Sequence, residues 1–385
     1  MNNQLIACVD FPKENSILND HYFLLASGWA INKSNNDIVI NIFINNKFYK
    51  TITTKTYRED IEKIYNNSGF KNTKKSGWNL NIPAIYLNKN KKNVIAFEFY
   101  DKKQKIVIKR KIFFNNYTNI YKRQKFIYKS LVCPLCKLKL IIKNRIYCKN
   151  CNKNFYRDKN KVIWIIENKK ISNFRKILFN SSIANNPYNQ ISTNIINKFK
   201  NGFILDLGSG YRADRFPNVI QVDITNYPTV DLVYDGNILP FKNNVFDAVI
   251  SESVLEHVPD PQNYIDEIYR VLKKNGEVII DSAFLQPLHG YPYHFFNTTI
   301  FGLKKLTKKF KEINSGVGPH QKAWISLRWI LDKYISFLPP LSKKKFLNMK
   351  ISEILKKLEN DNELKSITDE GNSNLAAGVF FHGKK

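Results

Sequence analysis

The chain has 385 residues, of which 43% are hydrophobic and 14% aromatic, so it is long enough for two or three domains and too apolar to be generally disordered. It contains no run of about 18 apolar residues, and its first residues lack the basic-then-apolar pattern of a secretory leader. We therefore expect a cytoplasmic protein without a transmembrane segment, and leave open whether it touches a membrane surface.

The net charge of +29 at pH 7 raises the question of an anionic partner. Only 10 of the 61 basic residues are arginine, and the lysines are spread from end to end. A dedicated polyanion surface usually concentrates arginine forks on one element, so we interpret this charge as solvated lysine faces. Nucleic acid, a phosphorylated glycan carrier and membrane headgroups remain alternative partners.

Residues 1–118 carry short alternating apolar runs separated by polar turns. Residues 37–49 form such a run with a hairpin-type turn at Asn45 and Asn46, and residues 94–100 and 106–108 form another pair. This pattern predicts a small all-β sandwich as the first domain. Its Ser-Gly-Trp segments resemble accessory β-modules found beside bacterial glycan-modifying enzymes, which implies a binding or spacing role.

Four cysteines follow in two pairs, Cys133 with Cys136 and Cys148 with Cys151, with eleven residues between the pairs. Two thiolate pairs of this spacing can complete a tetrahedral sulfur site, for which Zn²⁺ is the expected occupant and iron the alternative. Four thiolates leave no open coordination position, so the metal would be structural. We predict a zinc ribbon over residues 125–168, similar to ribbons that accompany methyltransferases.

From residue 203 onward, apolar strand patterns alternate with helical ones. Strands are expected at residues 203–207, 219–222, 232–233, 246–250, 277–281 and 310–313, with a last strand at 376–382 and a helix at 263–272. This alternation predicts a multidomain chain whose third domain, residues 180–385, has a doubly wound Rossmann-like α/β fold. A helical insert is expected at about 320–370, either capping an acceptor pocket or lying on a membrane surface.

Acidic and glycine residues follow the first two of these strands. Asp206 precedes Gly208 and Gly210, and Asp223 ends the next strand, where a carboxylate can contact ribose hydroxyls. Dinucleotide-binding sites share this arrangement. Ala213, however, stands where their fingerprint has its third glycine, which argues against NAD.

Several motifs then occur in order: Asp-Leu-Gly-Ser-Gly at 206–210, Val-Asp at 222–223, Asp-Gly-Asn at 235–237 and Leu-Glu-His-Val at 255–258. Together they resemble the class I S-adenosylmethionine-dependent methyltransferases. The resemblance implies that S-adenosylmethionine is the cofactor and that the following residues border it: Tyr188, Asp206, Gly208, Ser209, Gly210, Asp223, Ile224, Asp235, Gly236, Asn237, Ser251 and Glu252.

A loop after the fifth strand carries the candidates for acceptor chemistry. His289, Tyr291 and His294 lie in it without a run of charges, as suits a site for a neutral polar acceptor. A general base is needed only where the acceptor is protonated, as a sugar hydroxyl is. We predict that a histidine of this loop is the base or orients the acceptor, while His257 is expected to be structural.

These observations predict a methyltransferase that O-methylates a surface glycan or its precursor. An RNA methyltransferase is the first alternative, because of the cysteine motif and the net charge. A non-catalytic protein that only senses the cofactor is the second. The sequence leaves the acceptor atom and the oligomeric state undetermined.

Overall fold

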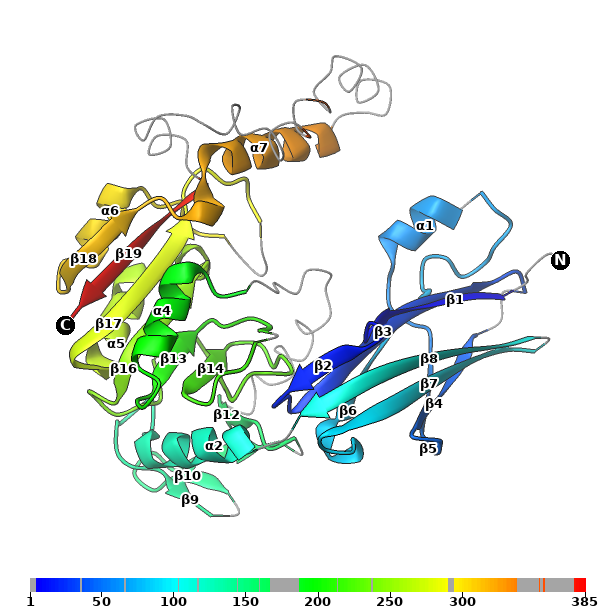
Figure 1. The fold of residues 1–385 in the computed structure, drawn as a ribbon, viewed down its shortest axis with the longest axis horizontal. Helices are drawn as coiled ribbons and strands as arrows, with labels where there is room; N and C mark the ends of the chain where they lie inside the picture. Colours follow the sequence, from blue (N-terminus) through cyan, green and yellow to red (C-terminus); the bar gives the residue numbers. More distant parts are fainter. Residues whose placement is uncertain are drawn as a thin grey trace.

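A computed structural model of the protein describes residues 5–34, 37–65, 67–102, 104–115, 118–143, 145–158, 160–166, 187–212, 214–236, 238–289, 294–337, 353, 356 and 377–385. An N-terminal β region (residues 5–115) lies beside a larger part that is built on one long sheet (Figure 1). No helix in the described ranges is long and apolar enough to cross a membrane.

The N-terminal β region consists of two sheets that share one hydrophobic core. The strands follow each other as β1 (Leu5–Phe11), β2 (Ser16–Asn19), β3 (Phe23–Asn32), β4 (Val39–Ile44), β5 (Lys47–Thr53), β6 (Gly77–Pro83), β7 (Lys91–Asp101) and β8 (Gln104–Asn115), with α1 (Glu59–Tyr65) and the 3-10 turn η1 (Ala84–Tyr86) between them. One sheet has the order β1-β3-β6 and the other β2-β8-β7-β4-β5. Alternate residues of both sheets, such as Ile82 in β6 and Phe97 in β7, are fully buried in the shared core.

The hairpin expected at Asn45 and Asn46 is confirmed. Both residues have positive φ, 50° and 67°, and they connect the antiparallel strands β4 and β5. Asparagine tolerates this left-handed conformation, which matches the right-handed twist of the flanking strands. Trp78 is buried in the core, with its ring centre 5.2 Å from that of Phe97.

The predicted doubly wound sheet is also confirmed. Its strands are β13 (Ile204–Leu207), β14 (Val219–Asp223), β15 (Leu232–Tyr234), β16 (Phe246–Glu252), β17 (Leu272–Ala283), β18 (Lys311–Gly316) and β19 (Gly378–Lys384). They are ordered β18-β19-β17-β16-β13-β14-β15, parallel except that β19 pairs antiparallel with both neighbours. The carboxyl ends of the parallel strands therefore share one edge, where ligands bind in such folds.

Several predicted boundaries differ from the structure by a few residues, and two of them have a clear physical reason. The fifth strand begins at Leu272 rather than Glu277, since Leu272 already pairs with Phe246 before a register shift. The sixth strand begins at Lys311, and Phe310 packs its buried ring against Tyr269 instead.

The helices of this part are α4 (Gln190–Lys198), α5 (Pro261–Val271), α6 (Ile300–Leu306) and α7 (Ala323–Phe337), with 3-10 turns η3 (Leu255–His257) and η4 (Pro319–Gln321). In α5, Asp260 caps the first turn by accepting from the Asn263 N–H, and Tyr264, Ile268 and Val271 bury one face. Most of the expected insert lies outside the described residues, beyond α7. The proposed cap therefore stays a prediction.

The cysteine segment extends the same sheet. Its strands are β9 (Ile141–Ile142), β10 (Ile146–Cys148), β11 (Lys153–Arg157) and β12 (Ile163–Ile165), and β12 pairs in parallel with β15. Helix α2 (Thr118–Ser130) precedes the segment, and its Phe126 ring stacks 3.9 Å from that of Phe203. The segment is thus structurally continuous with the doubly wound sheet. The domain limits at 118, 125–168 and 180 remain predictions.

A buried ionic cluster joins the N-terminal β region to the rest. We call Asp20, Tyr22, Arg123, Arg215 and Asp231 the interface cluster; each of the four charged side chains is at most 5% exposed. The Tyr22 hydroxyl donates to Asp231 Oδ1 at 2.7 Å, and Arg123 and Arg215 each approach the same atom at 3.0 Å. The two parts are therefore held together by specific, buried contacts.

Candidate functional site

The turn after β13 has a backbone that requires glycine. Gly208 and Gly210 have φ values of 72° and 59°, in the left-handed region that most residues avoid. A Cβ added at Gly208 would also lie 2.5 Å from Val254 Cγ2. The expected tight turn is present, and its backbone N–H groups lie at the carboxyl edge of the sheet.

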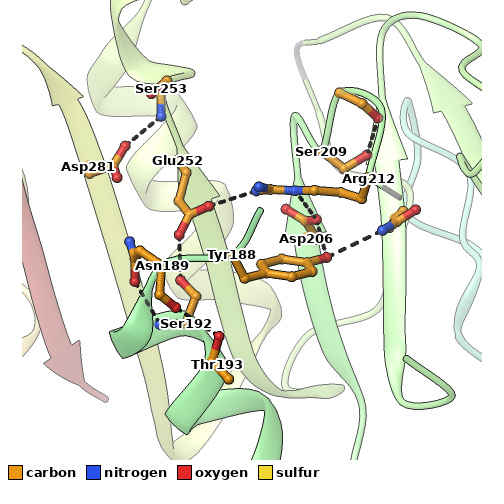
Figure 2. Close-up of polar contacts among 12 residues, drawn as sticks. Tyr188, Asn189, Ser192, Thr193, Asp206, Ser209, Arg212, Glu252, Ser253 and Asp281 are labelled. Atoms are coloured by element: carbon orange, nitrogen blue, oxygen red, sulfur yellow. Dashed lines mark hydrogen bonds and ion pairs between the residues drawn. The ribbon is translucent and has the colours of Figure 1, made fainter. Parts of the chain in front are cut away.

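Asp206 lies at the centre of this edge and is fully buried. Its Oδ2 atom accepts from the Tyr188 hydroxyl at 2.6 Å and from Arg212 Nε at 3.3 Å (Figure 2). Its Oδ1 atom has no hydrogen-bond partner within the described ranges. One oxygen of this buried carboxylate is therefore hydrogen-bonded, and the other is unpaired in the described part of the chain.

Arg212 pairs with two acidic residues, Asp206 and Glu252, which lie on different strands. Its Nη2 group donates to Glu252 Oε2 at 2.7 Å, and its guanidinium carbon lies 4.2 Å from the centre of the Tyr188 ring (Figure 2). Burial by itself would lower the pKa of Arg212, but the neighbouring carboxylates more than offset this and raise it. We call Tyr188, Asp206, Arg212 and Glu252 the carboxyl-edge cluster.

The sequence analysis assigned no role to Arg212 and therefore missed it. The Arg212 side chain folds back across the glycine turn and donates to Asp206. The spacing of backbone motifs does not predict this contact. The sequence gives one sign of this role: Arg212 lies two residues after Gly210, just beyond the turn that follows Asp206.

Asp223 lies beside the same turn, on the next strand. Its Oδ2 accepts from the Gly210 N–H at 2.8 Å and its Oδ1 from the Thr225 N–H at 2.7 Å. Burial raises the pKa of Asp223 to about 6, although these N–H groups oppose the rise. Ile224 follows it and approaches the next turn, since a Cβ on Gly236 would lie 3.3 Å from Ile224 Cγ2.

The remaining predicted cofactor residues fall into three groups. Ser251 is fully buried and shares a 2.8 Å hydrogen bond with the Tyr264 hydroxyl, while Glu252 Oε1 accepts from Ser192 Oγ at 2.6 Å. Ser209 is buried in the turn, and Asp235 lies directly before Gly236. Asn237 lies outside the described residues.

Three histidines gather at the carboxyl ends of β16 and β17. The ring centres of His289 and His294 are 4.5 Å apart, and that of His257 lies 5.2 Å and 5.7 Å from them. His257, expected to be structural, thus belongs to the same cluster as the two predicted histidines. Burial lowers the pKa of His289, which favours its neutral form. Tyr291 lies outside the described residues.

The four cysteines converge on one point. Their sulfur atoms lie within 4.8 Å of one another, with Cys133 and Cys151 at 3.9 Å and Cys136 and Cys148 at 3.5 Å. Lys137, which follows the first pair, and Asn152, which follows the second, have φ of 60° and 50°. Both thus take the left-handed conformation that lets a metal-binding knuckle turn. Four thiol donors at this spacing fit a tetrahedral Zn²⁺ ion.

Comparison with known proteins bears on the doubly wound part. A family model described as a methyltransferase domain matches residues 205–280. The methyltransferase resemblance expected from the sequence is therefore confirmed for this segment, which contains the glycine turn, Asp223 and His257.

Two curated relatives each match a short stretch of the chain. Mitochondrial arginine-hydroxylase NDUFAF5 of Homo sapiens is 35% identical over 74 residues, which are 19% of this chain and 21% of the relative. Demethylmenaquinone methyltransferase of Streptomyces avermitilis is 32% identical over 93 residues, 20% of this chain and 40% of the relative. The chain therefore spans less than half the length of either relative.

Among solved structures, phosphoethanolamine N-methyltransferase 2 of Haemonchus contortus is 18% identical. The similarity covers 56% of this chain and 57% of the other, with a TM-score of 0.33.

Proposed function

We propose that this protein is an S-adenosylmethionine-dependent methyltransferase that acts on a hydroxyl group. The open Oδ1 atom of the fully buried Asp206 carries the proposal. A buried carboxylate oxygen without a partner costs free energy, unless a ligand donates to it. The methionine ammonium group of the cofactor is such a donor, and it would lie beside the glycine turn.

The other acids fit the remaining parts of the same cofactor. Asp223, held at the end of β14 by two backbone N–H groups, offers its carboxylate to the ribose hydroxyls. By resemblance to the family, the site divides into a methionine end (Asp206, Gly208, Ser209, Gly210), a ribose side (Asp223, Ile224), an adenine edge (Asp235, Gly236, Asn237) and a methyl region (Ser251, Glu252). Tyr188, at the entry to this part of the chain, is proposed to contact the cofactor as well. Arg212 is a positioning residue that fixes Asp206 and Glu252.

When bound, the cofactor supplies an electrophilic methyl group on a sulfonium. The protein's task is then mainly alignment, because the displacement needs the acceptor oxygen in line with the methyl carbon. The Tyr188 ring lies against the Arg212 guanidinium, which in turn pairs with Glu252 of the proposed methyl region.

The histidine cluster is the proposed place of the acceptor hydroxyl. The His289 Nδ1–H donates to the Pro287 carbonyl at 3.0 Å, so the lone pair of this neutral ring is on Nε2. In His294, Nε2 donates to Phe296 O and Asn297 Oδ1, while Nδ1 accepts weakly from the His289 N–H at 3.4 Å. His289 is therefore better suited than His294 to accept from an acceptor hydroxyl. The proposed role of Tyr291 rests on the sequence alone.

A surface glycan or its precursor is the proposed substrate class. It is supported by the neutral, polar histidine loop and by the N-terminal β region, which is fixed to the methyltransferase part by the interface cluster. RNA is the second candidate, favoured by the net charge of +29.

We further propose that the four cysteines hold a structural Zn²⁺. Cys133 and Cys148 are buried and Cys136 and Cys151 are partly buried, in a short segment with few other core residues. Metal analysis of the purified protein should give about one equivalent bound by this set. A Cys136→Ser variant that retains the full equivalent would contradict the assignment.

The reaction is tested by incubating the protein with cofactor carrying a labelled methyl group, separately with fractionated envelope precursors and with total RNA. We expect label in the glycan fraction. Label in RNA alone, with binding that weakens steeply as salt rises, would replace the glycan proposal. One relative bears the name of a hydroxylase, so transfer itself must be measured. Cofactor binding without transfer to any acceptor would support the sensor alternative.

A further inference from the structure

We propose that Glu256, His257 and His289 form a binding site for a divalent transition metal ion of the Zn²⁺ or Co²⁺ type, separate from the four cysteines. One ligand atom from each residue lies within 4.8 Å of the other two. Ligands around a single Zn²⁺ ion are roughly 3.5 Å apart, a spacing that small side-chain rotations would reach. The cysteine set belongs to a different part of the sheet, next to β9–β11.

Glu256 contributes a buried carboxylate with an open oxygen. The residue is 1% exposed; its Oε2 accepts a long, 3.4 Å bond from Ser282 Oγ, and its Oε1 has no hydrogen-bond partner in the described part of the chain. A carboxylate in this position is costly unless a cation or donor pairs with it. The backbone of Glu256 is fixed as well, because its carbonyl accepts from the Phe295 N–H at 2.7 Å.

His289 has the hydrogen bond typical of a metal-binding histidine. Ligating imidazoles generally donate their second N–H to a carbonyl or carboxylate, which orients the ring and leaves the other nitrogen free to bind. The 3.0 Å bond from His289 Nδ1 to Pro287 O is of this kind and leaves the lone pair on Nε2. His294 lies in ring contact but uses both nitrogens in hydrogen bonds, so it is not a member of the ligand set.

Two imidazoles and one carboxylate are a familiar ligand set for catalytic metal ions. Such sites hold the metal by three protein ligands and keep a further position open for water or substrate. The three residues come after the carboxyl ends of β16 and β17. They therefore lie at the same edge of the sheet as Asp206, which is close to the carboxyl end of β13. Its open position would face the region where an acceptor is expected.

If the proposed methyltransferase function holds, the open position would take the acceptor hydroxyl oxygen. With the metal bound, the lone pair on His289 Nε2 would hold the ion, so His289 would act on the hydroxyl through the metal and would no longer accept its proton directly. The metal would act as a Lewis acid and promote loss of the hydroxyl proton to water. A C–O bond then forms to the methyl carbon, the C–S bond breaks, and its electron pair stays on sulfur. This part rests on the proposed function, whereas metal binding does not.

The test is titration of the purified protein, with its cysteine site loaded with zinc, by Co²⁺ alone, followed by calorimetry and by visible absorption. We expect one equivalent of Co²⁺ with a spectrum that lacks thiolate-to-cobalt charge transfer. His289→Ala should weaken cobalt affinity by at least about 100-fold, since even outer-shell partners contribute 10- to 100-fold. His289 is exposed, so this variant should keep its fold, which a thermal melt would verify. Glu256→Gln should act in the same direction.

His294→Ala is the matched control and should bind cobalt as the unaltered protein does. Absence of an equivalent bound outside the cysteines would overturn the proposal, as would unchanged affinity in His289→Ala, or equal loss in His294→Ala. If the protein binds cobalt but not S-adenosylmethionine, the metal site is supported and the proposed function is contradicted. If it binds S-adenosylmethionine but not cobalt, the proposed function is supported and the metal site is contradicted.

Discussion

Two buried arginine–carboxylate clusters in this molecule differ in how completely their central aspartates are paired. In the interface cluster, Asp231 accepts on both oxygens: Oδ1 from Tyr22, Arg123 and Arg215, and Oδ2 from the Gln221 N–H at 3.0 Å. In the carboxyl-edge cluster, Asp206 accepts on Oδ2 only. Both aspartates are fully buried.

We propose that this difference distinguishes a structural contact from a binding site. Burying a charge is expensive, and a fully paired carboxylate recovers that cost within the protein. Although burial would raise the pKa of Asp231, Arg123 and Arg215 hold it below its ordinary value. One oxygen of Asp206 accepts no hydrogen bond in the described part of the chain, and we propose that a ligand donates to it. The interface cluster should therefore govern stability, and the carboxyl-edge cluster should govern affinity for the cofactor.

The largest expected effect is on stability, from Asp231→Asn. The substitution leaves two buried guanidinium groups without their shared charge, so the free energy of unfolding should fall by about 3–5 kcal/mol. Denaturant unfolding measures it. As a control, Asp266→Asn breaks the more exposed ion pair with Lys309 and should cost no more than about 1 kcal/mol. Equal losses of unfolding free energy in the Asp231→Asn and Asp266→Asn variants would contradict the stabilising role of the interface cluster.

The next effect is a pH dependence of the same interface. Burial is the main reason that the pKa of His21 is lowered from 6.5 to about 4, and this residue is 1% exposed. Between pH 6.5 and pH 4, His21 is protonated in the unfolded chain but neutral in the folded protein. Its contribution to the free energy of unfolding is therefore fully present above pH 6.5 and is lost as the pH falls toward 4. The loss should be about 3 kcal/mol.

Unfolding measured from pH 8 to pH 4 for the unaltered protein and for His21→Gln would isolate this contribution. The unaltered protein should show the steeper decline below pH 6.5. Parallel curves would mean that His21 is not held neutral by the contact between the two parts. The His21 ring also lies 3.1 Å from the Tyr211 hydroxyl, beside the glycine turn.

A smaller effect concerns the carboxyl edge. Burial raises the pKa of Asp223 to about 6, and its ionised form is the one that should bind ribose hydroxyls. Affinity for the cofactor should therefore be complete well above pH 6 and be lost as the pH falls through this value, by about tenfold at pH 5. Calorimetric titrations at pH 5 and pH 8 measure it, and Asp223→Asn should remove the difference. A variant with the same pH dependence would assign the titration to another group.

The sequence predicted the parts of the fold that depend on neighbouring residues. Apolar runs ending in Asp206 and Asp223, and the left-handed turn at Asn45 and Asn46, are local patterns with local physical causes. The four cysteines were equally predictable, because two short spacings bring the thiols of each pair together.

What the sequence did not reveal depends on contacts between distant residues. Tyr22 and Asp231 are 209 positions apart, and no periodic pattern links them. The pairing of β12 with β15 joins the cysteine segment to the sheet through Ile163 and Leu232, which are 69 positions apart in the sequence. His257 lies in a motif that suggested a structural role, and only the folded chain brings its ring against His289 and His294.

Calorimetric titration of S-adenosylmethionine into the unaltered protein and into Asp206→Asn tests the central claim most directly. The asparagine keeps the shape of the side chain but removes the charge that an ammonium group would meet. We predict saturable one-to-one binding to the unaltered protein and a loss of about 1.5–3 kcal/mol in the variant, roughly 10- to 150-fold in affinity. Failure of the unaltered protein to bind, or equal affinities in the two proteins, would contradict the account.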